Sequence, residues 1–177
     1  MRPRRRFVLA KTVLVLIGAL LLQIGAVADL RLLGATGDLL LLLAVAAGWV
    51  DGPDRGLSWG FAAGLAYDLV LDTPFGLSAL TYAVVGYAVG LVSVALSRPA
   101  GWWPVSIAAL AGVLATGIYA GVGHLVGVPY PFGDLPPVAL VVAAWNAVLI
   151  LPVMRLMRRL VGAQKPDRIA LVLGGRR

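Results

Sequence analysis

The sequence predicts an all-α membrane protein, a polytopic bundle of six transmembrane helices. Of its 177 residues, 60% are hydrophobic and only 13% are charged, and its mean hydropathy is +0.94. A soluble domain of this composition could not cover its surface with polar groups. The apolar residues are gathered in segments about as long as a bilayer is thick, and the length of the chain allows one domain of this kind.

Six hydrophobic segments follow one another along the chain, each close to or above the ~20 residues that a helix needs to cross a bilayer. Turn-forming sequences that contain proline separate several of them, at residues 51–54, 73–74, 98–99 and 129–137. The second and third segments are the shortest, so they require local thinning of the bilayer or shelter inside the bundle. The predicted helices cover residues 8–28, 34–50, 57–73, 75–97, 104–127 and 135–155.

The basic residues orient the bundle. With a cytoplasmic amino terminus, every Lys and Arg except Arg31 falls on the cytoplasmic side, as the positive-inside rule requires. An even number of spans then places both termini in the cytoplasm. We expect a transmembrane domain over residues 1–160 and a basic cytoplasmic tail over residues 161–177. The net charge of +7 suits anionic lipid head groups, because the basic residues lie at the ends of apolar segments rather than on a face that would bind nucleic acid.

The first segment has a second interpretation. Its Arg-rich start, its apolar run and the sequence Ala26-Val27-Ala28 together imitate a secretory signal with a cleavage site. The apolar run is longer than most signal cores and further spans follow, so we interpret it as the first transmembrane helix. Cleavage would leave the remaining topology unchanged.

A stripe of small and acidic residues marks the third segment. Gly56, Gly60, Gly64, Asp68 and Asp72 are spaced four apart, which puts them on one face of a helix. Small residues let helices approach closely in lipid, and carboxylates there are costly and usually functional. Two interpretations stay open, namely packing inside the bundle and a surface for other membrane proteins. The same glycine spacing recurs at Gly86/Gly90, Gly117/Gly121 and Gly123/Gly127.

Other polar residues are sparse enough to consider singly. Asp38 follows Gly37 at the start of the second segment, where it is expected to cap a helix. Gln23 is expected to form a hydrogen bond across helices. Near the outer end of the third segment, Asp68 requires a polar partner or water. Its candidate partners are Tyr67, Tyr82, Tyr87, His124 and Asn146.

The spacing of these carboxylates raises the alternative of an enzyme. Gly64, Asp68 and Asp72, preceded by Asp51 and Arg55, partly resemble the metal-binding signature of CDP-alcohol phosphatidyltransferases. The predicted topology places Asp51 and Asp72 at opposite ends of a helix of ~20 residues, about 30 Å apart, so they cannot share a metal ion. Cysteine is absent, and the single histidine has no placed catalytic partner. We expect no catalytic, cofactor or metal site.

The order of several short blocks resembles a known family. Residues 34–92 read GATGDLLLLLAVAAGWVDGPDRGLSWGFAAGLAYDLVLDTPFGLSALTYAVVGYAVGLV. This stretch is similar to the core of MreD, the rod-shape-determining membrane protein, in four blocks: Asp38 before an apolar helix, GFAAGLAYD, the Pro-Phe-Gly-Leu turn, and Val-Gly-Tyr with its following glycine. The clear similarity covers about a third of the chain. The basic amino terminus, the Gln23-bearing first helix and the six spans fit as well.

The resemblance implies a non-catalytic, multi-pass protein of the bacterial plasma membrane that acts in cell elongation. Its implied partners are an MreC-like scaffold protein and a RodA-like glycan polymerase with its penicillin-binding transpeptidase. The implied fold is similar to the substrate-binding S-components of energy-coupling-factor transporters, which supplies an alternative function as a small-molecule-binding transporter subunit. For that alternative, a pocket lined by Asp68, Tyr82, Tyr87 and Asn146 is expected. The residues expected to pack helices or bind partners are Asp38, Gly60, Gly64, Asp68, Pro74, Gly76, Gly86 and Tyr87.

Overall fold

The computed structural model describes residues 3–27, 36–71, 74–96, 101–128, 133 and 135–162, and within these ranges the chain is all-helical. Each observed α-helix corresponds to one predicted segment. The helices are α1 (Pro3–Leu22), which continues into the π-helical turn η1 (Gln23–Val27), α2 (Leu39–Asp51), α3 (Pro53–Asp68), α4 (Leu77–Ala95), α5 (Trp103–Leu125) and α6 (Leu135–Gly162).

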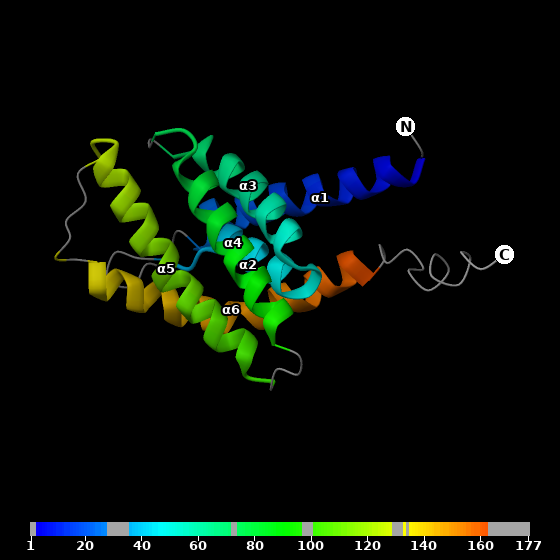
Figure 1. Cartoon of the computed structure of the whole chain (residues 1–177). Helices are drawn as coiled ribbons and strands as arrows, with labels where there is room; N and C mark the ends of the chain where they lie inside the picture. Colours follow the sequence, from blue (N-terminus) through cyan, green and yellow to red (C-terminus); the bar gives the residue numbers. More distant parts are fainter. Residues whose placement is uncertain are drawn as a thin grey trace.

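α2 is the central helix of the bundle (Figure 1). All of its residues from Leu40 to Gly48 are buried, and it contacts every other α-helix. A helix that is apolar on all sides requires an apolar environment all round it. With 13 residues, α2 is about 20 Å long, which is less than the ~30 Å hydrocarbon layer of a bilayer. Protein rather than lipid therefore supplies most of its surroundings.

α3 and α4 form the most extensive helix pair, and both pack on α2. Gly52 alone connects α2 to α3, and its φ of 91° lies in the region that favours glycine. Pro53 then starts α3, a position where its missing N–H costs nothing. The tight turn at Gly52 keeps α2 and α3 together, so that α2, α3 and α4 form one packed unit.

The remaining helices surround this unit. α6 packs against α5 and α2, while α5 also contacts α4, and α1 contacts α2 and α3. The start of α1 and the last turns of α6 project to the same side of the molecule, at the right of Figure 1. The two ends of the described helical bundle therefore lie at one end of the protein.

Within the described ranges, three helices are long and apolar enough to cross a membrane, namely α4, α5 and α6 as far as Leu160. Shorter apolar helices cover Ala10–Gly25 and Leu39–Asp51. Large apolar side chains of the long helices point away from the bundle, and Leu110 and Leu140 are each 68% exposed. Such surfaces suit contact with lipid, and we conclude that this is a membrane protein.

Some predictions concern residues outside the described ranges. They include Arg31, Asp72, most of the proline-rich stretch 129–137 and the basic tail beyond Gly162. The predicted limit of the transmembrane domain, residue 160, falls within the last turn of α6.

Candidate functional site

The glycines of α3 face the backbone of α4. A Cβ atom added to Gly60 would lie closer than 3.0 Å to the carbonyl group of Tyr82, and one added to Gly64 would meet the backbone of Ala79 equally closely. Gly56 stands in the same relation to the carbonyl group of Gly86. No side chain fits at these positions, so the stripe is where the two helix backbones touch.

Glycines of the neighbouring helices complete this contact. Gly86 of α4 meets the carbonyl group of Gly56, and Gly90 meets the backbone of Pro53. A Cβ atom on Gly48 of α2 would also meet the carbonyl group of Gly86. In lipid, where apolar side chains gain nothing by leaving the solvent, this close backbone contact stabilises the α2–α3–α4 unit by van der Waals packing. The stripe from Gly56 to Asp68 is thus covered by the protein's own helices.

The other glycine pairs differ from one another. A Cβ atom on Gly117 or Gly121 of α5 would meet nothing within 4 Å, so this pair lies on an open face. Gly123 is buried in ordinary contact with Leu77, and Gly127 has a φ of 83° in the turn after α5. Equal spacing in the sequence therefore has three different structural meanings here.

Asp68, at the end of α3, caps the start of α4. Its Oδ2 accepts hydrogen bonds from the N–H groups of Gly76 (2.9 Å) and Ala79 (3.2 Å), and its Oδ1 accepts from that of Ser78 (3.0 Å). The carboxyl group is only 4% exposed. Its acceptors satisfy N–H groups that a helix start leaves without partners, and its charge suits the positive end of the helix dipole. The side chains proposed from the sequence as partners are replaced by backbone donors.

The turn before α4 depends on Pro74 and Gly76. The carbonyl group of Pro74 accepts the hydrogen bond of the Leu77 N–H (3.2 Å), and Gly76 has a left-handed φ of 99°. Together with the Asp68 carboxylate, these contacts satisfy every N–H at the start of α4. The DxxxD ending of the stripe thus supplies a helix cap through its first aspartate.

Replacing Gly76 with alanine should destabilise the protein through backbone strain alone, because nothing lies within 4 Å of the added Cβ. A left-handed conformation costs a non-glycine residue about 1–2 kcal/mol, which lowers the melting temperature by roughly 2–8 °C. Tryptophan-fluorescence melting in detergent measures the change. Gly101→Ala is the matched control, since Gly101 is equally open and has no positive φ. An equal effect at both positions would contradict the role of the turn.

Asp38 and Tyr82 form a second polar contact at the same end of the bundle. The Asp38 carboxylate caps α2 by accepting the hydrogen bond of the Leu41 N–H (2.9 Å), the role predicted for it. Its other oxygen accepts a short hydrogen bond from the Tyr82 hydroxyl group. Tyr82 is also stacked on Tyr67, with ring centroids 6.4 Å apart. The sequence contains no spacing signal for this pair, because 44 residues separate its members.

Gln23 and Asn146 hold the segment before α2. The Gln23 amide donates to the carbonyl group of Gly37 and accepts from the Leu39 N–H, both at 2.9 Å. The Asn146 Oδ1 lies 3.5 Å from the Asp38 amide nitrogen. Gln23 therefore bonds across helices, as predicted, and it does so with backbone groups at the start of α2.

A pocket of about 280 Å³ lies at this end of the bundle. It contains residues from every helix or from the segment directly before or after it, including Gln23, Asp38, Tyr82, Thr116 and Val142. Of the four residues predicted to line a ligand pocket, Tyr82 does so. Asp68 is used as a cap, Asn146 contacts the Asp38 amide nitrogen and is not part of the lining, and Tyr87 is 38% exposed on the outer face of α4.

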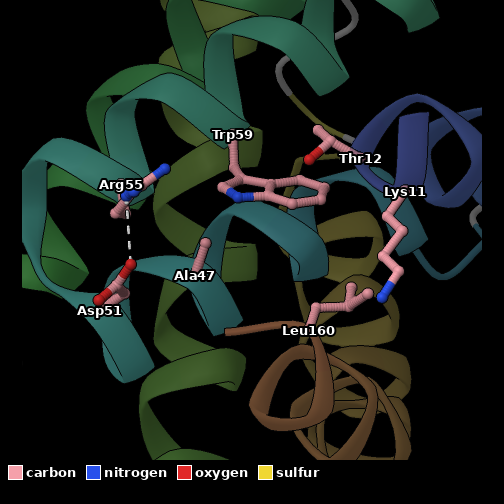
Figure 2. A pocket seen from close by; sticks show the side chains of 7 residues that line it. All are labelled: Lys11, Thr12, Ala47, Asp51, Arg55, Trp59 and Leu160. Carbon is pink, nitrogen blue, oxygen red and sulfur yellow. Dashed lines mark ion pairs between the residues drawn. The ribbon is translucent and has the colours of Figure 1, made fainter. Parts of the chain in front are cut away.

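A cleft at the other end of α2 is much smaller. Figure 2 shows Trp59 lying across it, with Lys11 of α1 opposite Leu160 of α6, and the exposed ion pair of Arg55 with Asp51 (3.2 Å) at its edge. Its volume of about 10 Å³ has room for no more than one water molecule.

Carboxylates and histidine do not gather in the described part of the chain. No three Asp, Glu or His residues there lie close enough to hold a metal ion. Asp51 ends α2 and Asp68 ends α3, with the 16 residues of α3, about 24 Å of helix, between them. The separation predicted from the sequence was that of Asp51 and Asp72, and Asp72 lies outside the described residues.

The fold and these contacts define a helical membrane protein in which several of the described polar residues cap helices or line a pocket. The chain matches the model of a family, the rod shape-determining protein MreD, over residues 4–160, and it belongs to that family. The match extends from the start of α1 to the last turn of α6. A search of curated proteins and a search of solved structures each find no match.

Proposed function

We propose that this protein is a non-catalytic scaffold of the machinery that synthesises lateral peptidoglycan and determines cell shape, in the bacterial plasma membrane. The observation that supports the proposal is the family match, which covers all six helices. Two of the protein's carboxylates, Asp38 and Asp68, accept hydrogen bonds from backbone N–H groups at the starts of α2 and α4. The protein would act by holding partner helices in a competent arrangement, without making or breaking bonds.

The proposed topology has six spans, with both termini in the cytoplasm. The common direction of the start of α1 and the end of α6 supports it (Figure 1). The short helices α2 and α3 would complete their spans within the bundle, because α2 is enclosed by protein. The basic residues at the cytoplasmic end would then contact anionic lipids.

The outer face of α4 is the surface that we propose for partner helices. Because the glycines of α4 face inward, the opposite side of the helix is presented outward on the rigid α2–α3–α4 unit. Apolar residues and one tyrosine follow each other along it at helical spacing, and each is 38–70% exposed. They are Leu80, Val84, Tyr87, Leu91 and Val94. The proposed partners are an MreC-like scaffold protein and a RodA-like glycan polymerase with its penicillin-binding transpeptidase.

Co-purification from the native host in mild detergents tests the scaffold function. We expect the wild-type protein to recover an MreC-like or RodA-like partner, and Val84→Trp to reduce that recovery about tenfold by blocking close helix contact. Val148→Trp on α6 is the control, because Val148 is also outward-facing and 67% exposed. Recovery of neither partner in several detergents contradicts the scaffold. Equal recovery with Val84→Trp contradicts only the assigned surface.

The alternative, an S-component-like subunit of a transporter, is favoured by one observation, the 280 Å³ pocket lined by residues of α2 to α6 and of η1. Membrane transporters commonly bind their substrates between helices. A thermal-shift screen of the purified protein against vitamins and their precursors tests it. A saturable shift with one such compound, together with recovery of an energising subunit, would favour transport over the scaffold.

A further inference from the structure

In the 280 Å³ pocket, several polar side chains have hydrogen-bond acceptors free but donors already in use. Several of its polar side chains use their donors within the protein. Thr81 and Thr116 donate to the carbonyl groups of Leu77 (2.8 Å) and Gly112 (2.9 Å), one turn earlier in their own helices. The Tyr82 hydroxyl group donates to Asp38. A hydroxyl group that has donated its proton keeps oxygen lone pairs that can accept further hydrogen bonds.

Gln23 also uses its hydrogen-bonding groups within the protein. Its amide group donates to Gly37 and its carbonyl group accepts from Leu39, so both ends are committed to the backbone before α2. Among the groups whose donors are already used, a ligand in the pocket meets acceptors: the oxygens of Thr116 and Tyr82, and the carboxylate of Asp38. The hydroxyl groups of Thr36, Tyr67 and Tyr119 also line the pocket, and each can accept as well as donate. The nearby amide nitrogen of Asn146 does not change this balance, because Asn146 lies against Gly112 and outside the lining.

The described side chains that line the pocket carry a negative charge and no positive one. Asp38 is its acidic residue, and no Lys, Arg or His is found among the described residues that line it. The carboxylate accepts hydrogen bonds from Leu41 and Tyr82, both neutral donors. A carboxylate surrounded by helices in a membrane is costly without a positive charge nearby, so the pocket favours a cation.

Aromatic rings complete the site. Tyr67, Tyr82 and Tyr119 come from α3, α4 and α5 and all line the pocket, with the first two rings stacked at an interplanar angle of 19°. Tyrosine faces attract cations, and grouped aromatic rings are a common way to bind an ammonium group. The volume of about 280 Å³ is far larger than a metal ion requires and suits a small organic molecule.

We propose that this pocket binds an organic ammonium group, with Asp38 as its counter-ion, the oxygen of Thr116 as an acceptor of its N–H groups, and the tyrosines around it. The pocket lies where α2 and α4 begin and α3 ends, hence towards one face of the membrane, where lipid head groups are found. The ammonium group is that of an ethanolamine phospholipid or of a free amine, two sources with the same chemistry. The inference goes beyond the scaffold function and does not depend on it.

Binding to the full-length purified protein tests the proposal. Its melting temperature is measured with ethanolamine, with ethylene glycol as the neutral analogue, and in micelles doped with phosphatidylethanolamine or phosphatidylglycerol. Native mass spectrometry counts retained lipids. We expect a saturable shift with the amine and not with its neutral analogue. A shift with free ethanolamine identifies a free amine as sufficient, and a shift confined to phosphatidylethanolamine identifies the lipid head group.

Substitutions at the two ends of α2 test whether the ammonium group binds in this pocket. Asp38→Asn retains a side chain that caps helices well but removes the charge, and it should weaken ammonium binding about tenfold or more. Asp51→Asn makes the same change at the other end of the same helix, in an exposed ion pair, and should bind as the wild type does. Thr116→Val, which removes one acceptor from the lining, provides a second variant if Asp38→Asn does not fold.

Two results would overturn the proposal. The first is an equal shift of the wild-type protein with ethanolamine and ethylene glycol, together with no preference for phosphatidylethanolamine over phosphatidylglycerol. The second is unchanged ammonium affinity in both folded pocket variants. Neither result bears on recovery of partner proteins, so failure of this inference is distinguishable from failure of the scaffold function.

Discussion

Replacing Gly60 with leucine is expected to prevent the α3–α4 pair from closing. Even a Cβ atom at this position would lie closer than 3.0 Å to the carbonyl group of Tyr82, and the obstacle is backbone that cannot rotate away. Overpacking a well-filled core costs about 1–3 kcal/mol, and backbone obstruction belongs at or above the upper end of that range. A melting temperature lower by roughly 6–12 °C, or failure to yield a monodisperse protein, is the expected result.

Gly121→Leu on α5 is the matched control for this substitution. Gly121 also lies in a small-residue pair within a long helix, but nothing lies within 4 Å of a Cβ atom placed there. Size-exclusion chromatography and tryptophan-fluorescence melting in one detergent compare the two variants. We expect the Gly121 variant to remain close to the wild type. If Gly60→Leu is equally stable, α3 and α4 do not meet along the stripe.

The Asp68→Ala substitution should have the second large effect. It removes the acceptors of three N–H groups at the start of α4, two of them in buried hydrogen bonds. Loss of a helix cap and buried donors without partners together cost about 3 kcal/mol, which lowers the melting temperature by roughly 6–12 °C. Asp68→Asn keeps one acceptor oxygen and should lose about half as much.

The control for Asp68 is Asp54→Asn, because Asp54 lies exposed in the first turn of α3. Loss of the Asp54 charge affects only the interaction with the helix dipole, which contributes about 0.3–1 kcal/mol to stability. Melting of the three variants in the same detergent ranks them. A ranking in which Asp68→Asn is as unstable as Asp68→Ala would show that the charge, and not the number of acceptors, determines the cap.

Much of the helical architecture was predictable because a membrane restricts the alternatives. Continuous apolar runs separated by proline and glycine specified the six helices, and the ends observed in the structure differ by only a few residues for α4 and α5. The spacing of Gly56, Gly60 and Gly64 identified a face without side chains. A spacing describes only one helix, so it could not show that α4 would cover this face.

The contacts of the polar residues could be predicted from the sequence only in part. Asp68 was expected to need a partner, and the sequence suggested water or side chains. The actual partners are backbone N–H groups, which every residue except proline carries and which leave no mark in a sequence. The Asp38–Tyr82 contact and the pocket require the positions of several helices relative to one another. Apolar segments alone do not encode those positions, because any outward apolar face is equally compatible with lipid.

The enclosure of α2 has a consequence for how the chain enters the membrane. α2 has only 13 residues, begins after one carboxylate and ends in another, and reaches stability by contact with α3, α4 and α6. Those three helices are all synthesised after it. The insertion machinery must therefore shelter α2 until α3, α4 and α6 arrive. The amino-terminal half of the protein is then fully integrated into the membrane only when α6 has been made.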